Sequence, residues 1–134
     1  MADAVTTQIV FDGERMAVMK FTNISDGTGE TAVAKVDVST LNPDSRGQAC
    51  DGVTLERVHC SVNGMSVAIL WEATADVPAF IAAPGMYTFD FTKIQLPNDA
   101  GAGKNGDVLF TTIGAAAGDT YTIVLEMVKT YAGT

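Results

Sequence analysis

The sequence predicts an all-β protein, an antiparallel β-sandwich or jelly-roll-like fold of about eight strands with little helix. Three observations lead to this prediction. Apolar and polar residues alternate along much of the chain, and β-branched residues are frequent within the alternating stretches. Turn-forming residues, including 13 glycines, separate these stretches at intervals of roughly ten residues. No internal repeat with a period of roughly 20–50 residues is visible, which argues against a propeller or a solenoid.

The first two strands are expected at residues 8–11 and 15–24, on either side of the turn signal Asp12-Gly13. Both faces of the second strand are largely apolar, which indicates burial on both sides for part of its length. A flexible loop at 25–29 then leads to a half-buried strand at 31–38. On one side of that strand the sequence places Ala32, Ala34, Val36 and Val38.

A loop at 39–52 follows and has room for one helical turn. The fourth strand is expected at 53–62, where the apolar positions shift phase between Leu55 and Val58. Such a shift predicts a β-bulge near Glu56–Arg57. Asn63-Gly64 is the strongest hairpin signal in the chain, and it leads into a buried strand at 65–72.

In the last part of the chain, Pro78 and Pro84 bound a short apolar piece at 79–81, and residues 87–91 alternate cleanly. A mobile loop is predicted at 96–106. The final two strands, at 108–113 and 120–131, are predicted to form a hairpin across residues 114–119.

Length and composition limit the classes of protein to consider. A chain of 134 residues suits one domain, and we expect a single β-sandwich domain over 1–134. Hydrophobic residues make up 47% of the chain, enough to form a core, so disorder of the whole chain is excluded. The longest uncharged stretch, at 58–71, is too short and too polar to span a bilayer.

The charge excludes two kinds of partner. The formal net charge is −8, and Arg15 and Lys20 are the only basic pair within a short span. Binding to nucleic acid needs clustered basic residues that displace counterions from phosphates, so we expect no nucleic-acid partner. The same argument of sign makes an anionic membrane surface an unfavourable partner.

The motifs that carry chemistry are weak. Gly101-Ala-Gly103-Lys-Asn-Gly106 matches a dinucleotide-binding pattern, but a Pro-Asn-Asp loop precedes it and a strand follows it, where the mechanism needs a strand and then a helix. We interpret it as a flexible loop. Asp26-Gly-Thr-Gly-Glu30 offers oxygen ligands for calcium but lacks the EF-hand pattern. Trp71 lies in an apolar run and is interpreted as a core residue.

His59 is the one histidine, so a nucleophilic site built on histidine would have to use it. Its neighbour Cys60 points to the opposite face of a strand, whereas an approach of Cys50 to His59 stays open. We interpret His59 as a partly buried strand residue. Three Cys and His residues in all are a poor set for zinc. The sequence therefore predicts no catalytic residue, no cofactor-binding residue, no metal ligand and no cofactor.

The opening Met-Ala-Asp-Ala-Val lacks a basic segment followed by an apolar run, so we expect no signal peptide and synthesis in a reducing cytoplasm. Free thiols at Cys50 and Cys60 are then favoured. Whether these two cysteines pair is left open.

As a whole, the chain resembles the capsid decoration, or cement, proteins of tailed bacteriophages. The similar segments are Asp12-Gly-Glu-Arg-Met-Ala-Val-Met-Lys-Phe-Thr-Asn-Ile-Ser25, Ile69-Leu-Trp-Glu-Ala73, Gly106-Asp-Val-Leu-Phe-Thr-Thr112 and Gly118-Asp-Thr-Tyr-Thr-Ile-Val-Leu-Glu126. The resemblance covers nearly the full length, but no residue in it carries chemistry. It implies a β-sandwich or jelly-roll protomer, commonly a homotrimer, on the outside of an icosahedral head.

From this resemblance we expect a non-enzymatic virion structural protein that is made in the host cytoplasm and binds the outer capsid surface. Its expected partners are the major capsid protein and further copies of itself. The resemblance identifies no capsid-contact residue. Two alternatives stay open: another phage head or tail part, such as a head-fibre base, neck or tail-tube protein, and a carbohydrate-binding module or small hydrolase.

Overall fold

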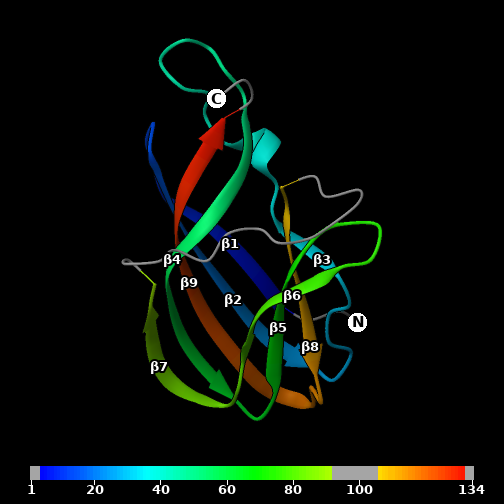
Figure 1. Cartoon of the computed structure of the whole chain (residues 1–134). Helices are drawn as coiled ribbons and strands as arrows, with labels where there is room; N and C mark the ends of the chain where they lie inside the picture. Colours follow the sequence, from blue (N-terminus) through cyan, green and yellow to red (C-terminus); the bar gives the residue numbers. More distant parts are fainter. Residues whose placement is uncertain (1–3, 92–105, 132–134) are drawn as a thin grey trace.

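Two antiparallel β-sheets pack face to face in the computed structural model, which describes residues 4–91 and 106–131 (Figure 1). Sheet A has five strands in the order β1-β2-β9-β4-β7, and sheet B has four in the order β3-β8-β5-β6. The strands are β1 (Ala4–Asp12), β2 (Met16–Asp26), β3 (Val33–Val36), β4 (Cys50–Asn63), β5 (Ser66–Trp71), β6 (Val77–Ala82), β7 (Gly85–Asp90), β8 (Val108–Ile113) and β9 (Ala117–Tyr131). The predicted all-β sandwich is confirmed, and the described residues form nine strands rather than about eight.

The strand pairing is nested, which makes the fold a jelly roll. Strand β2 pairs with β9, β3 with β8, β4 with β7, and β5 with β6, so the chain resembles one long hairpin folded over on itself. In addition, β9 pairs with β4, and β8 pairs with β5. Strand β1 is added outside this set of eight and pairs with β2 at the edge of sheet A.

Two predicted hairpins are wrong, because their strands lie in different sheets. The turn at Asn63-Gly64 does reverse the chain, and Gly64 has the positive φ of +85° that such a turn requires. However, it connects β4 in sheet A to β5 in sheet B. Residues 114–119 likewise lead from β8 in sheet B to β9 in sheet A. The turn at Asp12-Gly13, in contrast, joins β1 and β2 in a true hairpin.

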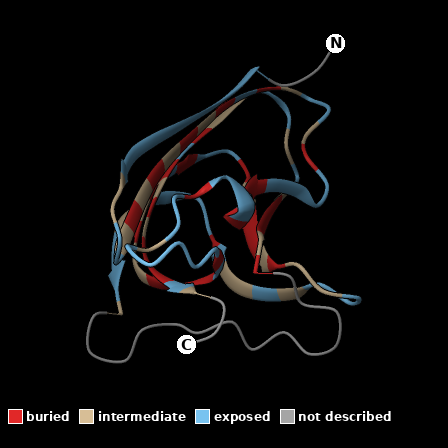
Figure 2. Cartoon of the chain, turned by 90° about the horizontal axis from the view of Figure 1, so that it is seen from above, coloured by how far each residue is buried: buried red, intermediate tan, exposed pale blue. Residues whose placement is uncertain are grey.

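The core lies between the two sheets and follows the alternation of the central strands. The inner residues of β9 are Tyr121, Ile123, Leu125 and Met127, and all are buried. The inner face of β2 is buried, but its outer face is only half-buried, so the predicted burial on both sides is weaker than expected on the outer side. Figure 2 shows the buried positions as bands that alternate with less buried ones along the strands. Aromatic residues link the sheets: the ring centroids of Phe21 on β2 and Phe110 on β8 lie 5.0 Å apart, and Trp71 is buried in the same core.

The bulge in β4 and the helical turn after β3 lie close to their predicted positions. The bulge near Glu56–Arg57 is confirmed, because the register of β4 against β9 shifts between Leu55 and Arg57. The helical turn in the 39–52 loop is confirmed as a 3-10 turn, η1 (Val38–Thr40), that begins one residue earlier. The loop predicted at 96–106 lies outside the described residues except for Gly106.

The prediction for residues 31–38 is wrong in length and in facing. Strand β3 covers Val33–Val36 only, and a register shift between Ala34 and Val36 interrupts the alternation. Ala34 is exposed as a result, while Lys35 is buried. Ala32 precedes the strand with a φ of +49°, so the chain enters β3 through a turn rather than as an extended strand.

Two buried lysines are held by carboxylates. Lys35 Nζ lies 2.5 Å from Glu30 Oε2, and the other Glu30 oxygen accepts hydrogen bonds from Asn23 (2.9 Å) and from the Tyr121 hydroxyl (2.6 Å). This network connects the β2–β3 loop to β3 and to the floor of the sandwich on β9. The carboxylate of Glu30 is thereby committed to protein partners.

Lys129, near the end of β9, fastens the β1–β2 hairpin to the loop after η1. Its ammonium donates to Asp12 Oδ1 at 2.6 Å, to the Gly13 carbonyl at 2.8 Å and to the Asn42 carbonyl at 2.7 Å. Burial alone would lower the pKa of Lys129, but the hydrogen bonds and charges of Asp12 and Tyr131 outweigh burial and raise it. The ammonium therefore stays charged in the folded protein.

Replacing Lys129 by alanine is expected to lower the free energy of unfolding by about 3–5 kcal/mol, because it leaves the Asp12 carboxylate, 10% exposed, without its cation. Chemical denaturation at neutral pH measures the loss. Because the folded pKa of Lys129 is raised, its contribution is present below the ordinary value of 10.5 and is lost as the pH rises through the folded value.

The control is Lys20→Ala, which removes a half-buried lysine from the outer face of β2. We expect this variant to change stability by less than about 1 kcal/mol. Equal losses in the two variants would contradict the role given to Lys129.

Candidate functional site

Exposed large apolar side chains in the described part of the chain gather on the edge strands. Apart from Ile24 and Ile113, they lie on β1, β3, β6 and β7, which are the outermost strands of the two sheets. The full set is Val5, Ile9, Val10, Phe11, Ile24, Val33, Ile81, Met86, Phe89 and Ile113. Such clusters on a soluble protein commonly mark contacts with other proteins.

We call the exposed apolar residues of β1, namely Val5, Ile9, Val10 and Phe11, the β1 flank. Val5 and Ile9 pair with Asn23 and Met19 of β2, whose side chains are buried in the core. Directly paired residues point to the same face of a sheet. Val5 and Ile9 therefore face the side that sheet B covers, yet about half of each side chain is exposed (47% and 46%). Strand β1 thus extends beyond the cover that sheet B provides.

We call the exposed apolar residues on the opposite side, namely Ile81 of β6 with Met86 and Phe89 of β7, the β7 flank. Aromatic contacts extend it inward. The Phe80 and Phe89 rings are 4.8 Å apart, and the Tyr87 and Phe89 rings are 5.2 Å apart, in edge-to-face arrangements. Met86 is 82% exposed, the highest value among the large apolar residues. Because β1 and β7 are the two edges of sheet A, the β1 and β7 flanks lie on opposite sides of the molecule.

A polar cluster lies between the flanks on the outer face of sheet A. His59 on β4 sits between two neighbours: its Nδ1 is 3.1 Å from the Thr88 hydroxyl on β7, and its Nε2 contacts the Glu126 carboxylate on β9. Arg57 Nη1 lies 3.2 Å from the other Glu126 oxygen, and Arg57 Nε lies 3.4 Å from Asp90. The hydrogen bonds and charges of Asp90 and Glu126 raise the pKa of Arg57.

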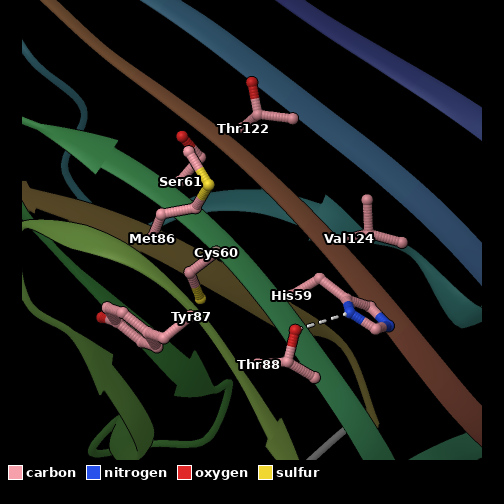
Figure 3. Close-up of a pocket in the computed structure, with 8 residues that line it drawn as sticks. All are labelled: His59, Cys60, Ser61, Met86, Tyr87, Thr88, Thr122 and Val124. Atoms are coloured by element: carbon pink, nitrogen blue, oxygen red, sulfur yellow. Dashed lines mark hydrogen bonds between the residues drawn. The ribbon is translucent and has the colours of Figure 1, made fainter.

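A shallow depression lies beside this cluster (Figure 3). It is formed where β4 is flanked by β7 and β9, and its lining residues are His59, Cys60, Ser61, Met86, Tyr87, Thr88, Thr122 and Val124. Cys60 and His59, neighbours on β4, lie on opposite faces of the sheet as predicted, because Cys60 is buried while His59 is half-exposed on the outer face.

The order hydroxyl–imidazole–carboxylate, from Thr88 through His59 to Glu126, is that of a nucleophilic triad. In the neutral tautomer with the proton on Nε2, His59 donates a hydrogen bond to the Glu126 carboxylate, and Nδ1 can accept a hydrogen bond from the Thr88 hydroxyl. Acyl transfer also needs donors directed at a developing oxyanion. Thr88 lies in the middle of β7, paired with His59 of β4, on an open sheet surface. The arrangement thus matches one part of a nucleophilic site in geometry, but it lies on an open surface without the enclosed cleft that usually surrounds such a site.

Sequence reasoning singled out His59 but missed Thr88 and Glu126. The sequence does indicate which face of the sheet Glu126 lies on. Glu126 alternates with the inner residues Leu125 and Met127, so it belongs on the outer face. Their proximity to His59 depends on the register of β4 against β7 and against β9, and the bulge after Leu55 shifts the β4–β9 register. A single sequence does not reveal that register.

The remaining candidates have structural surroundings. Cys50 and Cys60 are both free and buried, so no disulfide joins them. Trp71 is a core residue, as predicted. Glu30, the last residue of the suggested calcium loop, is engaged with Lys35 and Tyr121. The dinucleotide-like motif at 101–106 lies outside the described residues except for Gly106.

Within 4–91 and 106–131, no three His, Cys, Asp or Glu side chains gather as a metal site would require. Over the same residues no helix is long and apolar enough to cross a membrane. Comparison with known proteins finds no family model that matches the chain and no curated protein that matches its sequence.

Both thiols are expected to be almost unreactive in the native protein. Burial raises the pKa of Cys60 from 9.0 to about 11, and burial is also the main cause of the raised pKa of Cys50. At a fixed neutral pH, a shift of two units lowers the thiolate fraction about a hundredfold. Reaction with a chromogenic disulfide should therefore be slow in buffer and fast for two thiols per chain in denaturant. Fast native labelling of either cysteine would contradict the described packing.

Proposed function

We propose that this protein is a non-enzymatic structural component of a bacteriophage virion. In this proposal it is a decoration, or cement, protein that binds the outer surface of the capsid as a homotrimer and stabilises the head. Its partners are the major capsid protein and further copies of itself, without nucleic acid, membrane or cofactor. The observation that carries the proposal is the pair of apolar flanks on opposite edges of sheet A.

The physical reasoning starts from those flanks. A cement protein must contact at least two neighbouring subunits, and each contact shifts the equilibrium toward the assembled shell by its binding free energy. A protomer with one apolar flank could only cap a partner, whereas two opposite flanks allow it to bridge. The net charge of −8 keeps the rest of the surface soluble and unsuited to holding DNA.

Fold and sequence add support of a general kind. Jelly rolls recur in viral capsid proteins, and also in lectins and cupins, so the fold is compatible with the proposal without selecting it. The resemblance of the sequence to phage decoration proteins favours the capsid role among these uses. Other phage head or tail parts share the same argument from the flanks, and the experiment below separates them.

Adding the purified protein to phage heads that lack it should raise the temperature at which the heads disrupt. Saturation at a hundred times the dissociation constant would stabilise each contact by about 2.7 kcal/mol. Because apolar contacts carry the binding, the effect should persist at high salt. In dilute solution, light scattering should show a smallest species of three times the chain mass of 14.0 kDa.

The variant Phe89→Ser should weaken binding to heads, and the matched control His59→Ala should leave it intact. Phe89 belongs to the β7 flank, whereas His59 lies outside both flanks, on the outer face of the sheet. Failure of the wild-type protein to bind heads at any ionic strength would refute the decoration role. Binding to tails or necks instead would support the other phage structural role.

A small hydrolase is the second candidate, and one observation favours it: the Thr88–His59–Glu126 arrangement. We expect no hydrolysis of p-nitrophenyl esters above the buffer rate. If the arrangement were catalytic, the wild type would show activity, and His59→Ala would lower it by a factor of about 100 or more. Activity that disappears in His59→Ala would overturn the non-enzymatic proposal.

A further inference from the structure

Over residues 4–11, the edge strand β1 lacks the charges and prolines that usually protect such an edge, and the feature of this kind that it does have is the bulge before Phe11. In the described part of the chain it pairs on one side only, with β2. Edge strands of soluble proteins normally carry a lysine, a proline or an inward-pointing charge that prevents pairing with another chain. Residues 4–11 of this acidic protein contain no charge and no proline, and all of them are exposed. Figure 2 shows this exposure beside the buried positions of the neighbouring strand.

The regular part of β1 is short and has a near-palindromic pattern. Its pairing with β2 is regular from Ala4 to Ile9, and the register then shifts at a bulge before Phe11. Within Val5–Ile9, the residues that face the core side are Val5, Thr7 and Ile9, and the outward residues are Thr6 and Gln8. Read in either direction from Thr7, a polar residue comes first and a β-branched apolar residue second.

We propose that β1 is a self-association edge, through which two copies of this chain pair in antiparallel fashion with Thr7 on the two-fold axis. A two-fold axis normal to the sheet keeps the core-side residues of both copies on one side. Each residue then pairs with one of the same facing. With Thr7 opposite Thr7 of the second copy, Val5 lies opposite Ile9, and Thr6 lies opposite Gln8.

This register matches side chains by type. Pairs of β-branched apolar residues are favourable across an antiparallel ladder, and polar pairs on the outer face remain in solvent. It also gives hydrogen-bonding partners to the free edge and joins the two copies of sheet A into one continuous sheet. No charge opposes the contact along residues 4–11, although each chain carries a net charge of −8.

A second copy is a better occupant than an unrelated strand because one sequence supplies both halves of the match. The contact is isologous and closes after two copies, so it does not itself form a ring of three. If the protein is a homotrimer, this edge joins two trimers. If it is a monomer otherwise, the edge forms a dimer. The inference therefore does not depend on the proposed virion role.

Disulfide trapping tests the register. In the proposed pair the two Thr7 Cα atoms are about 4.5–5.5 Å apart, within the range that a disulfide spans. Thr7→Cys should thus form a covalent dimer on oxidation with copper phenanthroline. In Thr6→Cys the two cysteines are offset by two positions, at about 8 Å, so the dimer should form at least about ten times more slowly. The wild type, with two buried thiols, is the background control.

Sedimentation tests the association without a crosslink. The wild type should double the mass of its smallest species as the concentration rises. Thr7→Lys places two ammonium groups opposite each other and should lower the association constant at least about tenfold. Met86→Lys adds the same charge on the opposite edge of sheet A and should leave the doubling unchanged.

The variants should keep the wild-type circular dichroism spectrum, since Thr7 and Met86 are both exposed. Three outcomes overturn the proposal: equal crosslinking of Thr7→Cys and Thr6→Cys, a mass doubling that Thr7→Lys leaves unaffected, or the absence of any doubling in the wild type. Loss of binding to heads is a separate readout, so failure of the proposed function is distinguishable from failure of this contact.

Discussion

The register of β9 is the constraint on which the rest of the structure depends. This strand lies in the middle of sheet A and pairs with β2 on one side and with β4 on the other. The inner residues of β9 form one side of the core. Glu126 lies between Leu125 and Met127 in the sequence and points to the outer face of the sheet. A slip of one residue would drive Glu126 into the core and expel Leu125 and Met127, so the register has no nearby alternative. The placement of His59 and of Lys129 follows from it.

Much of the fold is readable from the sequence, because alternation reports which face of a strand meets the core. That signal located most strands and the bulge after Leu55, where the phase of the apolar residues changes. It also placed Trp71 in the core. Turn signals such as Asn63-Gly64 report only that the chain reverses. Which sheet the next strand joins is decided by distant partners, and two predicted hairpins were wrong for this reason.

The candidate site was less predictable than the fold. The facing of His59 follows from its buried neighbour Cys60, but its contacts with Thr88 and Glu126 bring together residues from three strands that are far apart in sequence. The β1 flank was missed for a different reason. Its residues have the composition of an ordinary half-buried strand, and their exposure results from sheet A having one strand more than sheet B. Such a mismatch of sheet widths is a property of the assembled sandwich.

The place of β9 in the chain has a consequence for synthesis on the ribosome. The strand lies at residues 117–131, yet it occupies the centre of sheet A, between β2 and β4. Until it emerges, β2 and β4 have no partner between them. The strands of sheet B and the β1–β2 and β4–β7 pairs all precede β9 in the chain, but sheet A still lacks its centre and cannot cover sheet B as one continuous sheet. The sandwich is therefore expected to close only when nearly the whole described chain has left the ribosome, and to close slowly because β9 pairs with segments distant in sequence.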